Sequence, residues 1–214
     1  MQENITPEME FEDPNSFYTK KESNRYEYSS GMKKTQNELT QVALDLSDFE
    51  KTNFSNLKVL DIGCGTGFSL EYLVFLGFEK NNLIGIEPSL EMKAICENKG
   101  FLTKEGGFED LSKLDLEKNY FDLIISISAF QWVLTNKSEI EIKNVCKKIS
   151  KSIFSLLKEN GKAIFQFYPP FGKNNEKYIE IILSIFNRIG FSSKKYIFKE
   201  NSIKKRKYFL IFSK

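Results

Sequence analysis

The sequence predicts an α/β fold with a mostly parallel sheet and helices on both of its faces. Apolar runs of strand length alternate with amphipathic segments of helix length, which is typical of βα units. In addition, the apolar run 57–62 leads into a loop with glycine at positions 63, 65 and 67 and then into a helix. Such a loop leaves room for a nucleotide-like ligand at the carboxyl ends of the strands.

Seven strands are expected, with helices between most of them. The strand candidates, in chain order, are 57–62, 82–87, 101–105, 121–128, 161–168, 194–199 and 206–213. The helix candidates are 33–49, 68–77, 89–98, 137–158 and 174–189. The connection after residue 105 is expected to be short and irregular, and Gly190 is a natural C-cap for the last helix. The last two strands are expected to pair antiparallel.

One domain is expected, preceded by a tail. The chain of 214 residues is long enough to bury a sizeable core, and no repeat or linker divides it. Residues 1–15 are acidic and contain two prolines, so we expect a mobile tail there. The domain would then cover 16–214, with an N-terminal lid and helix at 16–50 and a Rossmann-like core at 57–214.

Composition excludes several kinds of chemistry. The chain has no histidine, so histidine-dependent triads and histidine-ligated metals are excluded. Its cysteines, Cys64, Cys96 and Cys146, are odd in number and widely spaced, which favours a reducing compartment and argues against a disulfide framework or a zinc site. A net charge of +2 gives no strong overall field. Neither a signal peptide nor a membrane-spanning run is recognisable, so no membrane association is expected.

The ends of the first two strands carry carboxylates. Asp61 is next to last in the first strand, and Glu87 ends the second. A carboxylate at the second position can accept both hydroxyls of a ribose, one on each oxygen. A Rossmann dehydrogenase is the alternative, but its fingerprint is G-x-G-x-x-G, whereas the glycines here stand at every second position. Cys64, within the loop, is expected to be a small residue near the ligand and not a nucleophile.

Val59–Phe68 together with Ile86-Glu87-Pro88-Ser89 resembles motifs I and II of class I S-adenosylmethionine-dependent methyltransferases. The resemblance implies a Rossmann-like, seven-stranded sheet and S-adenosylmethionine as cofactor. It also implies that Asp61 faces the methionine moiety, whose ammonium and sulfonium favour nearby negative charge. After the third strand, Glu109 or Asp110 would accept from the adenine amine, with Glu109 favoured. The expected cofactor-binding residues are Tyr26, Asp61, Gly63, Cys64, Gly65, Gly67, Glu87, Pro88, Phe108, Glu109 and Ser126.

Aromatic and amide side chains follow the fourth and fifth strands. Gln131 and Trp132 follow one strand, and Tyr168 and Pro169 follow the other. Because both strands end at the same rim of the sheet, these residues would form a flat pocket for a planar heterocycle. The alternative is that the aromatic residues belong to the ordinary core. Neither an Asn/Asp-Pro-Pro motif after the fourth strand nor a nearby cysteine is present, which favours an acceptor such as guanine N7 that needs no general base.

Ile125-Ser-Ile-Ser-Ala-Phe-Gln-Trp132 with Gln166-Phe-Tyr-Pro169 resembles the small-subunit (18S) rRNA guanine-N7-methyltransferases of eukaryotic ribosome biogenesis. The resemblance covers about residues 16–213 and implies methylation of guanine N7 in ribosomal RNA, in the nucleus, nucleolus and cytoplasm of a eukaryote or in the cytoplasm of an archaeon. Glu87 replaces the aspartate usual in the family. The family's basic C-terminal extension, which would assist RNA binding and nuclear entry, is not found before Lys214.

The same resemblance implies a small zinc-binding activator subunit, which would add a strand to the sheet edge at 100–104. An edge covered by a helix is the alternative. RNA contacts are expected from Lys20, Lys21, Lys33, Lys34, Lys204, Lys205, Arg206 and Lys207. Two other functions stay open: a tRNA or small-molecule methyltransferase of the same fold, and a ribosome-assembly scaffold that binds the cofactor incidentally.

Overall fold

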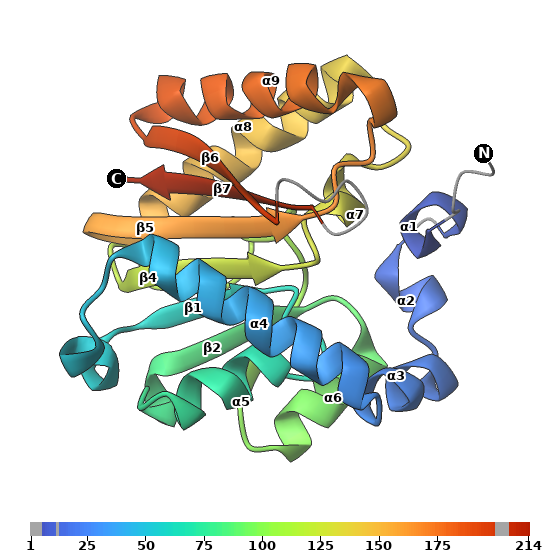
Figure 1. Ribbon diagram of the computed structural model, residues 1–214, viewed down its shortest axis with the longest axis vertical. Coiled ribbons are helices and arrows are strands. Elements are labelled where there is room, and N and C mark those ends of the chain that lie inside the picture. The colour runs from blue at the N-terminus through green and yellow to red at the C-terminus, as the bar shows by residue number, and fades with distance from the viewer. Residues whose placement is uncertain (1–5, 12, 200–205) are drawn as a thin grey trace.

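A computed structural model of the protein describes residues 6–11, 13–199 and 206–214. It contains a seven-stranded sheet of order β3-β2-β1-β4-β5-β7-β6 (Figure 1). The strands are β1 (Val59–Ile62), β2 (Leu83–Glu87), β3 (Leu102–Glu105), β4 (Phe121–Ile127), β5 (Leu157–Phe167), β6 (Ser192–Phe198) and β7 (Lys207–Ser213). β1 to β5 pair in parallel, and β7 is antiparallel to both β5 and β6. The predicted sheet and its antiparallel pair are confirmed.

Helices cover both faces of this sheet, as the alternation predicted. One face is covered by α4 (Ser30–Ser47), α5 (Phe68–Phe75) and α6 (Leu90–Asn98), the other by α8 (Glu139–Leu156) and α9 (Asn175–Ile189). Each group of helices closes its own cluster of buried apolar side chains against the strands. None of the described helices is long and apolar enough to span a bilayer.

Local sequence signals mark the ends of three helices. α6 begins after Ser89, whose hydroxyl accepts a hydrogen bond from the Met92 amide. α8 begins with a capping box formed by Ser138 and Glu141. α9 ends before Gly190, which adopts φ 121° and caps the helix as predicted. The loop between β2 and Ser89 borders the site described below.

Part of the segment expected to be a mobile tail is helical. α1 (Pro7–Glu10) lies within residues 1–15 and α2 (Pro14–Phe17) begins there, while α3 (Lys20–Glu27) falls in the expected lid; all three lie beside the carboxyl rim of the sheet (Figure 1). The Asn15 side chain accepts a hydrogen bond from the Leu90 amide at 3.0 Å, and Asn136 donates one to the Met9 carbonyl at 3.4 Å. Contacts with the domain therefore begin before residue 16, where the boundary was expected.

Two further details were not expected. A four-residue helix, α7 (Gln131–Leu134), follows β4 after the short segment 128–130. β5 begins at Leu157, four residues before the predicted start, because the chain enters the strand at the end of α8 without a separate loop. Short 3-10 turns occupy Lys51–Asn56, Lys80–Asn82 and Gly172–Asn174.

Candidate cofactor and substrate site

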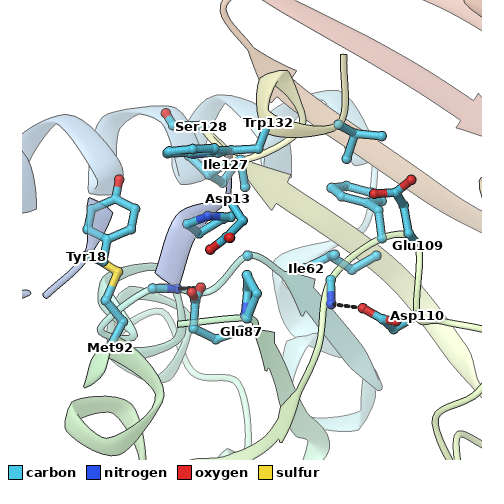
Figure 2. Close-up of a pocket in the computed structure, with 18 of the residues that line it drawn as sticks. Asp13, Tyr18, Ile62, Glu87, Met92, Glu109, Asp110, Ile127, Ser128 and Trp132 are labelled. Atoms are coloured by element: carbon cyan, nitrogen blue, oxygen red, sulfur yellow. Dashed lines mark hydrogen bonds between the residues drawn. The ribbon is translucent and has the colours of Figure 1, made fainter. Parts of the chain in front are cut away.

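A pocket of about 250 Å³ lies where β1, β2 and β4 end (Figure 2). Its walls come from the loops after these strands, from the loop after β3 and from the N-terminal segment. Of the residues expected to bind the cofactor, the lining contains Tyr26, Gly63, Gly65, Glu87, Pro88, Phe108 and Glu109. The position at the carboxyl ends of parallel strands is the usual one for ligands in open α/β sheets.

Glu87 is held rigidly at the floor of the pocket. Its side chain is only 4% exposed, one oxygen accepts from the Gly65 amide and the other from the Ser89 amide, each at 2.8 Å. Burial raises the pKa of this carboxyl to about 7. Each carboxylate oxygen has a second lone pair, so the group can still accept two hydroxyls on the pocket side. The backbone contacts thus orient a pair of acceptors that fits a ribose.

Position 63 requires glycine because the loop after β1 meets the loop after β4 there. Gly63 adopts φ 77°, and a Cβ there would lie 2.2 Å from the Cβ of Ala129. The amides of Gly63 and Cys64 both donate to the Ile86 carbonyl, at 2.8 and 3.1 Å. The loop is therefore held against both neighbouring strands with no space for a side chain at its first glycine.

The remaining expected cofactor residues do not line the pocket. Cys64 was expected near the ligand, but its thiol packs over Gly85, where a Cβ would lie 2.6 Å from the sulfur. Gly67, with φ 89°, instead gives space to the Cys96 sulfur beneath the start of α5. Ser126 is fully buried in β4.

Asp61 lies behind the glycine loop and is 1% exposed. One of its oxygens accepts from the Ser69 hydroxyl, and the other has no partner within the described part of the chain. Burial raises the pKa of this carboxyl to about 7. A buried acceptor without a partner fits a cationic group placed across the loop, because a nearby positive charge would favour the ionised carboxylate.

The two acids after β3 are distinguished by their contacts. Asp110 accepts from the Gly107 amide at 3.2 Å and from the Lys113 ammonium at 3.1 Å. Glu109 lines the pocket and makes no hydrogen bond within the described residues. Asp110 lines the pocket too, so the carboxylate without other contacts is that of Glu109 (Figure 2), and the choice of Glu109 for the adenine amine stays a prediction.

The N-terminal segment contributes residues that sequence reasoning missed. Asp13, Pro14 and Tyr18 line the pocket, with Asp13 and Tyr18 on the same side as Trp132 in Figure 2. The Tyr18 carbonyl accepts from the Ser89 hydroxyl at 3.3 Å, which ties the segment to the start of α6. No local pattern signals this contact, because it joins residues far apart in the sequence.

Ionic and aromatic contacts, together called the latch, hold the same segment against α5 and the end of α6. The Lys99 ammonium lies 2.7 Å from Glu27 of α3 and 3.1 Å from Glu71 of α5. Tyr26 stacks on Phe68 with ring centroids 5.4 Å apart. We call residues 13–28 the lid, since they cover the pocket and carry both contacts.

On the substrate side, only Trp132 of the four predicted positioning residues lines the pocket. Its ring lies 6.2 Å from that of Tyr18, centroid to centroid. Gln131 is buried and donates from its amide nitrogen to the Ser128 carbonyl at 2.8 Å. Tyr168 is 36% exposed outside the lining and accepts from the Lys207 ammonium at 3.0 Å.

Pro169 also lies outside the pocket lining, half-buried beside Tyr168. Among the expected RNA contacts, Lys20, Lys21, Lys33 and Lys34 are exposed, and Lys33 is also paired with Glu71 at 3.2 Å. Positions 204 and 205 lie outside the described residues. The structure thus brings the cofactor residues together more completely than the predicted base-binding residues.

A methyltransferase-domain family model matches residues 60–165, which include the glycine loop and the rim of the pocket. A probable 18S rRNA (guanine-N(7))-methyltransferase of Dictyostelium discoideum is 33% identical over 205 residues, covering 92% of this chain and 67% of that protein. The chain belongs to this methyltransferase family. The 18S rRNA (guanine-N(7))-methyltransferase of Bos taurus is 32% identical over 203 residues, with the same coverage of both chains.

Solved methyltransferases share the fold of this family member. A putative S-adenosylmethionine-dependent methyltransferase of Methanococcus maripaludis has a TM-score of 0.60 at 18% identity and covers 100% of this chain and 97% of its own. Phosphoethanolamine N-methyltransferase 2 of Haemonchus contortus, solved with S-adenosylmethionine, has a TM-score of 0.62 at 15% identity, covering 98% of this chain and 60% of its own. At such identities the likeness concerns the fold alone.

Proposed function

We propose that this protein transfers a methyl group from S-adenosylmethionine to guanine N7 in small-subunit ribosomal RNA, as a step of ribosome biogenesis. The observation that carries the proposal is the similarity to 18S rRNA (guanine-N7)-methyltransferases over 92% of the chain. The site of action would be where small subunits are assembled, in the nucleolus, the nucleus or the cytoplasm.

The pocket residues fit the groups of this cofactor, which supplies the transferable methyl when it is bound. Glu87 would accept from the two ribose hydroxyls with the lone pairs left free by its backbone contacts. Glu109 would accept from the adenine amine. The unpartnered oxygen of Asp61 would provide negative charge for the ammonium and sulfonium across the glycine loop.

Methylation at N7 asks little acid or base chemistry of the protein. Guanine N7 has a free lone pair and loses no proton when it forms the new bond, so alignment and exclusion of water are sufficient. Trp132 would stack on the base at the pocket wall. Tyr168 and Pro169, which lie outside the lining beside Lys207, would contact flanking nucleotides instead.

Transfer of labelled methyl groups tests this proposal. Purified protein, alone and co-expressed with the zinc-binding activator of the same genome, is incubated with labelled S-adenosylmethionine and undermodified small ribosomal subunits. We expect label in one guanine of the small-subunit RNA, with the chemical cleavage typical of N7-methylguanine. Label in tRNA or in a small metabolite instead would show that this molecule, and not ribosomal RNA, is the substrate. Cofactor binding without any transfer would favour the scaffold function.

We further propose that the activator binds the edge strand β3. This strand ends the sheet, so half of its backbone groups face outward, and Leu102 is 60% exposed there. Phe101 and Thr103, on either side, are buried. Leu102→Asp should abolish co-purification with the activator, whereas Ile140→Asp, at a 72% exposed position on α8, should not. Co-purification that survives Leu102→Asp would place the partner elsewhere.

A further inference from the structure

Buried polar atoms without partners are concentrated at the carboxyl rim of the sheet. Within the described part of the chain, such side-chain atoms occur in Asn37, Asp61, Thr66, Ser126, Gln131 and Gln166. All but Asn37 lie at the end of β1, β4 or β5 or in the segments that follow them. Asp61 and Thr66 belong to the cofactor side. Buried groups of this kind cost free energy unless something pairs with them, so those on the β4–β5 side need an explanation.

The side chains of Gln131 and Gln166 both form hydrogen bonds with Ser128. Ser128 lines the pocket and adopts φ 59°, a left-handed conformation that is unfavourable for serine. Its amide donates to the Gln166 carbonyl at 3.0 Å, and its hydroxyl donates to the Gln166 side-chain oxygen at 2.8 Å. Its carbonyl accepts from the Gln131 side-chain nitrogen at 2.8 Å. Every polar group of Ser128 is therefore held by one of the two glutamines.

In the structure, one end of each amide stays free. The Ser128 carbonyl can only accept, so Gln131 must turn its nitrogen toward it and leave its oxygen as a free acceptor. Gln166 uses its oxygen for the Ser128 hydroxyl and leaves its nitrogen as a free donor. One donor and one acceptor are thus provided beside the pocket wall.

We propose that Gln166 and Gln131, locked through Ser128, select guanine by donating to O6 and accepting from N1–H. This inference rests on the proposed function and extends it to the choice of base. Adenine also has an N7 atom, so N7 alone cannot exclude it, but adenine presents an amine at position 6 and an acceptor at N1. The two amide ends match guanine and oppose adenine.

Access requires a rearrangement of the atoms that cover the site. Both free amide ends are covered by protein atoms, and Trp132, which lines the pocket, follows Gln131 in α7. Entry of the base would turn the Trp132 side chain aside and expose the amide ends to the Watson–Crick edge of a flipped guanine, while the contacts with Ser128 keep both amides in place. Gln166, anchored in β5 opposite Ile127 of β4, would stay in place.

Base analogues at the modified position test the inference. Wild-type protein first identifies the methylated guanine in small-subunit RNA; if no guanine is methylated, the proposed function fails and the inference fails with it. Synthetic RNA fragments then carry guanine, inosine, 2-aminopurine or adenine at that position. Inosine keeps O6 and N1–H, whereas 2-aminopurine lacks both, so wild-type kcat/KM should be similar for guanine and inosine and about 10–100-fold lower for 2-aminopurine and adenine.

Gln166→Leu and Gln131→Leu distinguish base selection from a structural role. Each should lower kcat/KM for guanine about 10–100-fold but change it less than about threefold for 2-aminopurine, because that base never made the contact. Gln36→Leu, which removes another buried glutamine, on α4, is the matched control and should change neither value. Equal losses for guanine and 2-aminopurine, or full guanine activity in both rim variants, would overturn the inference even if the wild type methylates guanine N7.

Discussion

Replacing Glu87 by glutamine tests the cofactor site most directly. The carboxylate holds two backbone amides at 2.8 Å and is 4% exposed, so the glutamine must turn an NH2 group toward either Gly65 or Ser89. One backbone donor then loses its acceptor in the free and the bound protein alike, which lowers stability but not affinity, and one ribose hydroxyl loses a charged acceptor. Since the second change costs about 1–3 kcal/mol, we expect binding to weaken roughly 5–150-fold.

Titration calorimetry with S-adenosylhomocysteine measures this loss. Glu105→Gln is the matched control, because Glu105 is exposed and pairs in register with Glu87 on the neighbouring strand. A 2′,3′-dideoxy analogue of the ligand tests whether the loss concerns the ribose hydroxyls. Wild-type protein should prefer the natural ligand strongly, and Glu87→Gln should lose most of that preference. If Glu87→Gln weakens the binding of both ligands equally, the carboxylate does not bind the ribose hydroxyls, and the role given to Glu87 is wrong.

Three other outcomes follow from the same geometry. Because burial raises the pKa of Asp61 and of Glu87 to about 7, above the ordinary 3.8 and 4.5, the folded protein holds more protons than the unfolded chain between these values. Urea titrations of the free protein should therefore show a free energy of unfolding that falls as the pH rises from about 4.5 to 7, and a flat pH profile would contradict this expectation. Cofactor binding near pH 6.5 should release protons, which calorimetry in buffers of different ionisation enthalpy would detect. Gly63→Ala should destabilise the fold by about 2–4 kcal/mol in urea titrations, since its Cβ would clash at 2.2 Å, whereas Gly77→Ala, also at positive φ but with nothing within 4 Å, should cost about 1 kcal/mol; equal losses would show that backbone strain alone matters. Lys99→Met keeps the apolar stem but removes both ion pairs of the latch, and it should speed cofactor dissociation about 3–10-fold in stopped-flow measurements; an unchanged rate would mean that the lid does not limit release.

The strands and their carboxyl ends were predictable because their signals are local. The run Val59–Ile62 is apolar throughout and leads into a glycine loop, and Glu87 ends the next strand, so both the fold and the floor of the pocket could be placed from the sequence. The antiparallel pairing of the last two strands was predicted for the same reason. Their order in the sheet was not, because insertion of β7 next to β5 depends on packing and not on the pattern of either strand.

The parts that could not be predicted depend on contacts between distant residues. A lid was expected within 16–50, but the contribution of Asp13, Pro14 and Tyr18 to the pocket follows only from the approach of this segment to Trp132 and α6. Cys64 lies in the loop sequence, yet its side chain points to Gly85 because the loop curves toward β2. The network around Ser128 joins β4 to β5 through side-chain amides that a one-dimensional pattern cannot orient.

The position of β7 also has a consequence for synthesis on the ribosome. β6 is made before β7, but in the sheet β7 lies between β5 and β6 and pairs with both. While the chain is still being translated, β5 therefore has an open edge, and β6 has no partner until β7 has left the exit tunnel. Unpaired strands favour misassembly in partly made chains, so this protein should be most prone to aggregate, and to need a chaperone, between the emergence of β6 and that of β7.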